Sequence, residues 1–272
     1  MKNTSLNSRQ RQARGFTLVE VLISMSVITI VMTMCLSTFL FGLRTMYKDS
    51  QRLETNATLR ALMAQISKET LDASFFYLYP YYKDIDTNVS LVAGETGGPS
   101  SMKQIEDAAD NDYDKWVAHG DCLVLVTTTS QYRTTDIRQI RIYYRMVTTQ
   151  AERNQPKEFR YYETKDWDEG SSSTSNGHPL SGLAAELNAI NLAGNPSPSK
   201  YKVLAKQTIG RTVPVASSPF VAGDRYPVFS SESPDSTATN GFIAINMEVV
   251  NGTERNNLLS SSSFNYTVSP RR

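Results

Sequence analysis

One long apolar segment near the N-terminus constrains the fold of this chain more than any other feature. Among the 28 residues from Phe16 to Leu43, Glu20 alone carries a charge, and the 23 residues from Val21 to Leu43 carry none. A helix that crosses a membrane requires about 20 predominantly apolar residues. We therefore predict that residues 16–43 form a transmembrane helix, in preference to the buried helix of a soluble core.

The flanks of this segment carry unequal charge. Residues 1–15 hold four basic side chains and no acidic one, whereas the whole chain has a formal net charge of only +1. Basic residues on a short flank favour the cytoplasmic side, so we expect the N-terminus in the cytoplasm and residues 44–272 outside it. The apolar run exceeds the roughly 7–15 residues of a secretory signal, and no small-residue cleavage site follows it. The segment is therefore predicted to be a retained single-pass anchor.

Composition and motifs argue against several classes of protein. A near-neutral charge disfavours nucleic-acid binding, which depends on basic surfaces, so we expect no nucleic-acid partner. The predicted membrane boundary separates Cys35 from Cys122, so no disulfide is expected between them. The sequence holds no nucleophile-elbow, zinc-protease, P-loop or dinucleotide-binding motif. His119 near Cys122 is a weak signal for catalysis, and we expect no enzymatic activity.

Glu20 is the anomaly of the apolar segment. A carboxylate inside a membrane is costly unless it is paired, and no Lys or Arg lies within residues 16–43. One interpretation is that Glu20 pairs with a lipid headgroup, another chain or a new chain terminus. The other is that its side chain reaches the membrane surface without a specific partner. The position of the residue leaves both interpretations open.

The sequence around Glu20 matches a known processing motif residue by residue. Residues 14–23, RGFTLVEVLI, resemble the cleavage site of type IV prepilins and type II secretion pseudopilins. The shared pattern is a short basic leader, Gly, Phe, Thr, Leu, a hydrophobe, Glu and then about 20 apolar residues. The resemblance implies that a prepilin peptidase removes residues 1–15 by cutting after Gly15, and that the same enzyme methylates the new amine of Phe16.

The resemblance also implies roles for Glu20 and Thr17 in assembly. Cleavage would give Glu20 a partner, the positive amine of Phe16 on the same or a neighbouring subunit. The implied partners are the peptidase and methyltransferase, other pilin or pseudopilin subunits, an inner-membrane assembly platform and membrane lipid. The implied location is the bacterial inner membrane, spanned once, with the C-terminal domain in the periplasm or in the filament.

Residues 44–79 are predicted to continue the helix beyond the membrane. Apolar residues recur there at helical spacing, at Leu59, Leu62, Met63, Ile66 and Ala73. We expect one helix from Phe16 to about Tyr77, ended by Pro80, with its second half packed on a sheet. Four tyrosines cluster at its end, either as a contact surface or as packing of the helix on the domain. These are Tyr77, Tyr79, Tyr81 and Tyr82.

Residues 80–272 are predicted to form an extracytoplasmic domain rich in β-structure. Strand patterns occupy residues 89–93, 122–128, 139–147, 157–164, 201–206, 241–250 and 263–268. Two polar stretches, near 94–121 and 170–200, are predicted loop insertions, the second with a short helix at 183–192. The expected fold class is α+β and pilin-like: a long N-terminal helix packed on a mainly antiparallel sheet domain.

One acidic stretch resembles a calcium-binding loop. Asp110, Asp112, Asp114 and Asp121 occupy positions 1, 3, 5 and 12 of an EF-hand pattern, but Lys115 stands where the loop requires Gly. Some pseudopilins bind calcium, so these four residues are weak calcium candidates. The alternative is a solvated acidic loop. No other cofactor is expected.

The size of the chain favours a minor subunit. After cleavage about 257 of the 272 residues would remain, more than a typical major pilin has, and the organisation resembles W-type minor pilins and J-type minor pseudopilins. We expect a minor structural subunit of a type IV pilus or a type II secretion pseudopilus that enters or primes a filament. The alternatives are a major pilin, or a single-pass membrane-anchored extracytoplasmic binding domain that is not assembled into a filament.

The charge asymmetry predicts a measurable topology. A reporter that works only outside the cytoplasm, fused after Arg272, should be active, because the basic flank keeps the N-terminus inside. The same reporter fused after Gly15 should be silent, since it lacks the apolar segment. Whole-cell activity measures both; a fusion after Arg272 that is active only with a cytoplasmic reporter would contradict the predicted orientation.

Overall fold

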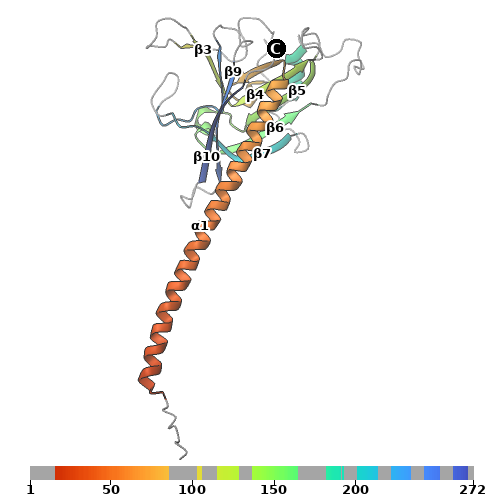
Figure 1. Cartoon of the computed structure of the whole chain (residues 1–272). Helices are drawn as coiled ribbons and strands as arrows, with labels where there is room; N and C mark the ends of the chain where they lie inside the picture. The colour runs from red at the N-terminus through yellow and green to blue at the C-terminus, as the bar shows by residue number, and fades with distance from the viewer. Residues whose placement is uncertain are drawn as a thin grey trace, which may run out of the picture. The chain divides into compact units, whose positions relative to one another are not determined.

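The computed structural model describes residues 16–85, 103–105, 115–128, 137–164, 182–190, 192, 201–213, 222–233, 242–251 and 260–268. The chain divides into two compact units, Met1–Ser50 and Gln51–Arg272 (Figure 1). The fold is α+β, a long apolar N-terminal helix and an antiparallel sheet domain, as the sequence predicts.

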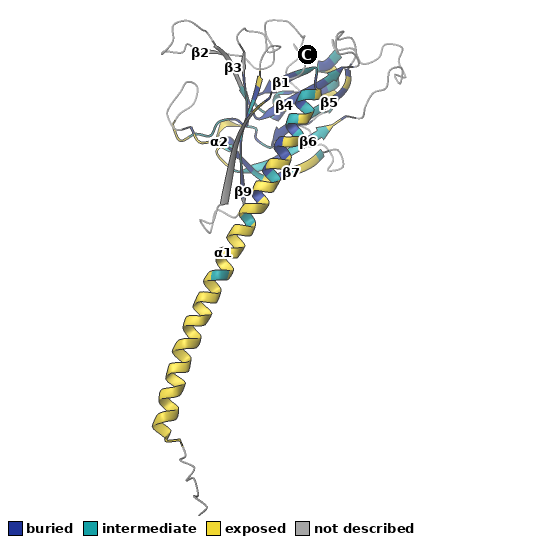
Figure 2. Ribbon diagram, viewed as in Figure 1, coloured by how far each residue is buried: buried dark blue, intermediate teal, exposed yellow. Residues whose placement is uncertain are grey.

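Helix α1 spans Leu18–Asp72 without interruption for 55 residues. Gly42 is its only glycine and it holds no proline, so little in its sequence opposes helix formation. Its N-terminal part is long and apolar enough to cross a membrane. Side chains are exposed almost throughout as far as Glu54, including large apolar ones (Figure 2). In water such a surface would be unfavourable, which fits a membrane-spanning segment.

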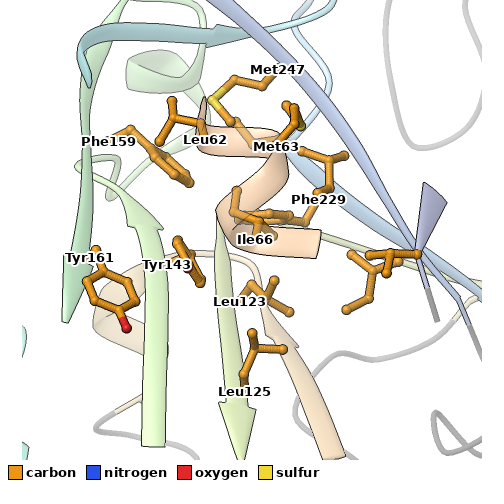
Figure 3. Close-up of a cluster of buried hydrophobic side chains, with 14 of the residues drawn as sticks. Leu62, Met63, Ile66, Leu123, Leu125, Tyr143, Phe159, Tyr161, Phe229 and Met247 are labelled. Carbon is orange, nitrogen blue, oxygen red and sulfur yellow. The ribbon is translucent and has the colours of Figure 1, made fainter. Parts of the chain in front are cut away.

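From Thr55 onward α1 buries one face on the sheet. The stripe expected from the sequence is confirmed: Leu59, Leu62, Met63 and Ile66 are at most 4% exposed. Figure 3 shows Leu62, Met63 and Ile66 against Leu123, Leu125, Tyr143, Phe159, Phe229 and Met247 of the strands. Burying each large apolar side chain contributes about 1.5–3 kcal/mol. This stripe therefore holds the second part of α1 on the domain.

The end of α1 corrects the prediction of a helix to Tyr77 or beyond. The helix ends at Asp72, and Phe75–Tyr79 form strand β1, which pairs with strand β4, Cys122–Thr128, over five consecutive residue pairs. The aromatic residues of this segment favour strands. Pairing with β4 also gives the backbone groups of β1 hydrogen-bond partners from a neighbouring strand. Pro80 follows β1 rather than ending the helix.

The described part of the second unit forms one ten-stranded sheet whose pairings are all antiparallel. Its order is β1-β4-β5-β6-β7-β9-β8-β3-β2, with β10 paired to β9. The remaining strands are β2 (Lys103–Ile105), β3 (Lys115–Gly120), β5 (Ile137–Arg145), β6 (Lys157–Glu163), β7 (Tyr201–Gly210), β8 (Phe229–Ser233), β9 (Phe242–Asn251) and β10 (Ser260–Val268).

Six of the seven predicted strand segments are confirmed, and the seventh, residues 89–93, lies outside the described residues. The predicted hairpin across residues 148–156 joins β5 to β6 and contains a short helix, α2, at Gln150–Arg153. The predicted loop at 94–121 needs correction, since it contains β2 and β3. Strand β3 pairs with β8, more than 100 residues later. Strand β3 also pairs with β2, which is close in sequence, so backbone pairing on both sides defines this strand.

The prediction of a surface insertion at 170–200 is corrected for its helical part. Helix α3, Leu183–Ile190, confirms the expected short helix, but Leu183 and Leu187 are fully buried. They pack in a second apolar cluster with residues of β4 and β5 such as Val124 and Ile142. The described sheet therefore has an apolar core on each face, one with α1 and one with α3.

The tyrosine cluster after α1 belongs mainly to this second core. Tyr77, Tyr79 and Tyr82 are at most 9% exposed, and the rings of Tyr82 and Tyr144 lie 5.6 Å apart. Short helix η1, Tyr82–Ile85, carries Tyr82 back onto the sheet. Their burial contradicts an exposed contact surface for these three side chains, and they pack within the second core rather than hold the helix end on the domain. For Tyr81, the guanidinium carbon of Arg153 lies over its ring, 5.0 Å from the ring centre.

A buried ionic triad lies at one end of the sheet. The Oδ1 atom of Asp121 is 3.2 Å from Nε of Arg145, and its Oδ2 atom is 2.7 Å from Nε of Arg153. The side chains of Asp121 and Arg145 are fully buried. Burial lowers the pKa of Arg145, and the neighbouring carboxylate of Asp121 opposes that shift. One carboxylate therefore compensates two buried guanidinium groups.

The triad connects segments that are far apart in the sequence. Oδ1 of Asp121 accepts a hydrogen bond from the backbone N–H of Val228 at 3.2 Å. Arg145 Nη2 donates to the carbonyl oxygen of Arg153 at 3.1 Å, and Arg153 Nη2 to that of Pro80 at 3.5 Å. The ends of β1 and β5, the β3–β4 junction, α2 and the segment before β8 thus meet at Asp121.

Neutralising the triad should destabilise the domain. We expect Asp121→Asn to lower the free energy of unfolding by roughly 3–5 kcal/mol, because it leaves two buried guanidinium groups uncompensated. Glu163→Gln is the control: it removes one of the two carboxylates beside Arg141, the other being Glu69, at a half-exposed site, where an ion pair contributes less than about 1 kcal/mol. Urea unfolding of the full chain in detergent measures both. Equal effects would contradict a special role for Asp121.

Candidate processing and assembly site

The structure shows where the helix begins relative to the expected cleavage site. Phe16 and Thr17 precede the helix, which starts at Leu18. The carbonyl oxygen of Thr17 accepts hydrogen bonds from the backbone N–H groups of Glu20, at 3.0 Å, and Val21, at 3.2 Å. Phe16 is 79% exposed. Gly15 lies outside the described residues, and cleavage after it stays a prediction.

The side chain of Thr17 caps the helix. Its Oγ1 atom accepts a hydrogen bond from the backbone N–H of Glu20 at 3.3 Å. The first N–H groups of a helix lack partners within it, and a Thr side chain at this position satisfies one of them. Thr with Glu three residues later, before an apolar run, is a known sequence signal for a helix start. This local signal marks Thr17 as a helix cap, in addition to the assembly role that the resemblance implies.

The structure places Glu20 in the first turn of α1. A helix N-terminus carries a partial positive charge that favours an acidic side chain there. In the described part of the chain, the Glu20 carboxylate takes part in no ion pair. An amine created at Phe16 would lie four residues before it, about one helical turn away. The expected pairing of Glu20 with that amine stays a prediction.

Most hydroxyl groups in and directly after the apolar segment are satisfied within the helix itself. Six donate to the carbonyl oxygen four residues earlier, at 2.8–3.0 Å: those of Ser24, Ser26, Thr29, Thr33, Thr38 and, two residues beyond the segment, Thr45. Polar groups in lipid must find partners inside the protein. Glu20 therefore differs in kind from these six residues, because a carboxylate cannot donate a proton to a carbonyl while it is ionised.

The calcium candidates are not brought together by the described structure. Asp110, Asp112 and Asp114 lie outside the described residues. Both carboxylate oxygens of Asp121 face arginines, which is the wrong electrostatic environment for a calcium ligand. No group of three or more metal-ligating side chains occurs among the residues that are described. A calcium site at the other three positions stays a prediction.

His119 and Cys122 do not have the ionisation states of a catalytic pair. Burial raises the pKa of the Cys122 thiol well above its usual value, an effect that the charge of Asp121 increases. Burial lowers the pKa of His119 to about 4, and Arg153 adds to the shift. Near neutral pH the thiol is therefore protonated and the imidazole uncharged, whereas a nucleophilic cysteine requires the thiolate. Both cysteines are free, Cys35 on the exposed part of α1.

Comparison with known proteins bears on the N-terminal segment. The family model described as the prokaryotic N-terminal methylation motif matches residues 10–36, which include Gly15, Phe16, Thr17 and Glu20. With the apolar helix that follows, this match supports a membrane-anchored protein of the type IV pilin and pseudopilin class. No curated protein and no solved structure matches the chain.

Proposed function

We propose that this chain is a minor structural subunit, a minor pilin or minor pseudopilin, of a type IV pilus or type II secretion pseudopilus. It is inserted in the bacterial inner membrane with its N-terminus in the cytoplasm and its sheet domain outside. A prepilin peptidase removes residues 1–15 and methylates Phe16. The subunit then joins, or primes, a filament with other pilin-like subunits through the assembly platform of the inner membrane.

One observation carries this proposal. The methylation motif at residues 10–36 ends inside a helix that starts at Leu18 and exposes apolar side chains as far as Leu53. A simple membrane anchor requires the apolar helix but none of the residues Gly15, Phe16, Thr17 and Glu20 that the motif includes. The combination of motif and helix supports a subunit that is processed and then assembled.

The chemistry of processing explains the isolated carboxylate. Cleavage after Gly15 creates an ammonium group beside the positive end of a helix, where a cation is disfavoured. Glu20 in the first turn offsets that charge, either within one subunit or between neighbours. Such a pair is strong in a medium of low dielectric constant. Between subunits it would fix the axial position of one helix against the next.

The domain supports a minor rather than a major subunit, and a structural rather than catalytic role. About 257 residues would remain after cleavage, and the ten-stranded sheet carries a core on each face. Such bulk suits a subunit present in few copies. The buried protonated thiol of Cys122 and the uncharged His119 support a structural role for that pair. Asp110, Asp112 and Asp114 stay candidate calcium ligands.

Processing gives the first test of the proposal. Mass spectrometry of the membrane protein should find N-methyl-Phe16 as its first residue when the peptidase is present. Gly15→Ala should be cleaved in part, whereas Gly15→Leu should remain full-length, because a bulky side chain prevents close approach of the enzyme to the backbone. A mature protein that retains residues 1–15 would favour a membrane-anchored binding domain that is not assembled.

The role of Glu20 is tested by separating its charge from its shape. Glu20→Gln removes the charge but keeps a side chain suited to the first helical turn, and Glu20→Asp keeps the charge. We expect Glu20→Gln to leave membrane insertion, folding of residues 80–272 and most of the cleavage intact. Its incorporation into filaments should fall at least tenfold, whereas Glu20→Asp should retain part of the wild-type incorporation. Cross-linking to co-expressed subunits measures incorporation. Wild-type incorporation of the Gln variant would contradict the ion pair.

A further inference from the structure

Two basic side chains of α1 directly follow its apolar segment. Arg44 comes immediately after Leu43, and Lys48 lies one helical turn later. Both are exposed, and neither takes part in an ion pair within the described part of the chain (Figure 2). Asp49 follows Lys48 but projects about 100° away around the helix axis. Residues four apart lie on one face of a helix, so this face presents two cations without an acidic partner.

The depth of these two residues in a membrane follows from helix geometry. The hydrocarbon core is about 30 Å thick, the length of about 20 helical residues. If residues 24–43 cover it, the backbone of Arg44 lies about 1.5 Å and that of Lys48 about 7.5 Å beyond the hydrocarbon. Headgroups occupy about 5–7 Å on each side. Helical side chains lean toward the N-terminus, here the membrane side, so both cations reach the headgroup phosphates.

An exposed tyrosine lies at the same depth. Tyr47 is 68% exposed and lies three residues after Arg44, on a neighbouring position of the helix surface. A tyrosine ring carries an apolar body and a polar hydroxyl, and it is favoured where a membrane meets water. Its position therefore supports a membrane surface at this turn of α1.

We infer that Arg44 and Lys48 bind the phosphate groups of anionic phospholipids in the outer leaflet of the membrane that α1 spans. Basic side chains next to a membrane span are attracted to anionic lipid, and their N–H groups form strong hydrogen bonds with phosphate oxygens. The inference rests on the proposed function for the orientation of the helix, and it adds the leaflet, the chemical group and the two residues that bind it.

These contacts would determine how deeply the mature helix is inserted. Residues 16–43 contain no Lys or Arg, so removal of residues 1–15 leaves the amine of Phe16 as the only cation of the inner flank. Glu20 lies close enough in sequence to offset that amine. Arg44 and Lys48 are then the cations that hold α1 at a membrane surface. A subunit that leaves the bilayer for a filament has to give up their phosphate contacts.

The test measures the lipid selectivity of the purified full-length chain in phosphatidylcholine bilayers. Spin-labelled phosphatidylglycerol and spin-labelled phosphatidylcholine report how much of each lipid is held at the protein surface, and their ratio gives a relative association constant. The wild type should prefer phosphatidylglycerol. Arg44→Gln with Lys48→Gln should lower the preference about fivefold, the attraction expected of a basic residue at an anionic membrane surface. Molar salt should lower the preference of the wild type, because it screens exposed charges.

Two more distant arginines of α1 provide graded controls. By the same count, the backbone of Arg52 lies about 13.5 Å and that of Arg60 about 25.5 Å beyond the hydrocarbon, and both side chains are exposed. Arg60→Gln should leave the selectivity unchanged, and Arg52→Gln should lower it less than Arg44→Gln does. Residues 1–15 are present in every variant, so their basic side chains contribute equally. A loss in Arg60→Gln equal to that in Arg44→Gln would show attraction by net charge and overturn the inference.

The remaining outcomes distinguish this inference from the proposed function. If the wild type and the double variant have the same relative association constant, the two residues do not bind lipid phosphate and the inference is wrong. If the double variant also loses cross-linking to co-expressed subunits, Arg44 and Lys48 face acidic groups of a neighbouring subunit instead. Mass spectrometry of the wild type tests the proposed function separately, since the absence of N-methyl-Phe16 would refute processing without changing the lipid selectivity.

Discussion

Inside a membrane, backbone groups have no water to bind, and this constraint determines the conformation of the chain from its first described residues. In lipid every polar backbone group needs a partner within the protein, and α1 meets that need by running unbroken from Leu18 to Asp72. Seven hydroxyl groups along it bind carbonyl oxygens of the preceding turn. Thr17 and Glu20 lie at its start, where the first backbone N–H groups lack partners within the helix. The candidate processing and assembly residues thus lie where the helix itself leaves backbone groups unpaired.

The domain depends on a different kind of interaction. Its sheet is assembled from segments distant in sequence, and the carboxylate of Asp121 lies where five of them meet. A single buried carboxylate between two guanidinium groups contributes less to stability than its Coulomb energy suggests, because all three groups lose their hydration. Its geometric effect is to hold these strand ends together, since without Asp121 two buried guanidinium groups would lack their carboxylate.

The candidate site was largely predictable, and the reason is that it is local. Phe16, Thr17 and Glu20 lie within five residues, so their spacing in sequence fixes their spacing at the start of α1. The cap formed by Thr17 was equally local and could have been found from Thr and Glu three residues apart. The arginine partners of Asp121 could not be predicted in the same way, because Arg145 and Arg153 lie 24 and 32 residues further along the chain.

The sequence by itself determined the apolar helix, its buried stripe from Leu59 to Ile66 and the strands with regular alternation, because periodicity within a segment reports the face that it buries. Only the tertiary structure decided where α1 ends, that Lys115–Gly120 forms a strand, and that Leu183 and Leu187 belong to a core. Each of these depends on a partner elsewhere in the chain, β4 for β1, β8 for β3, and β4 and β5 for α3. A local pattern carries no record of such partners, since pairing energy arises only when the segments meet.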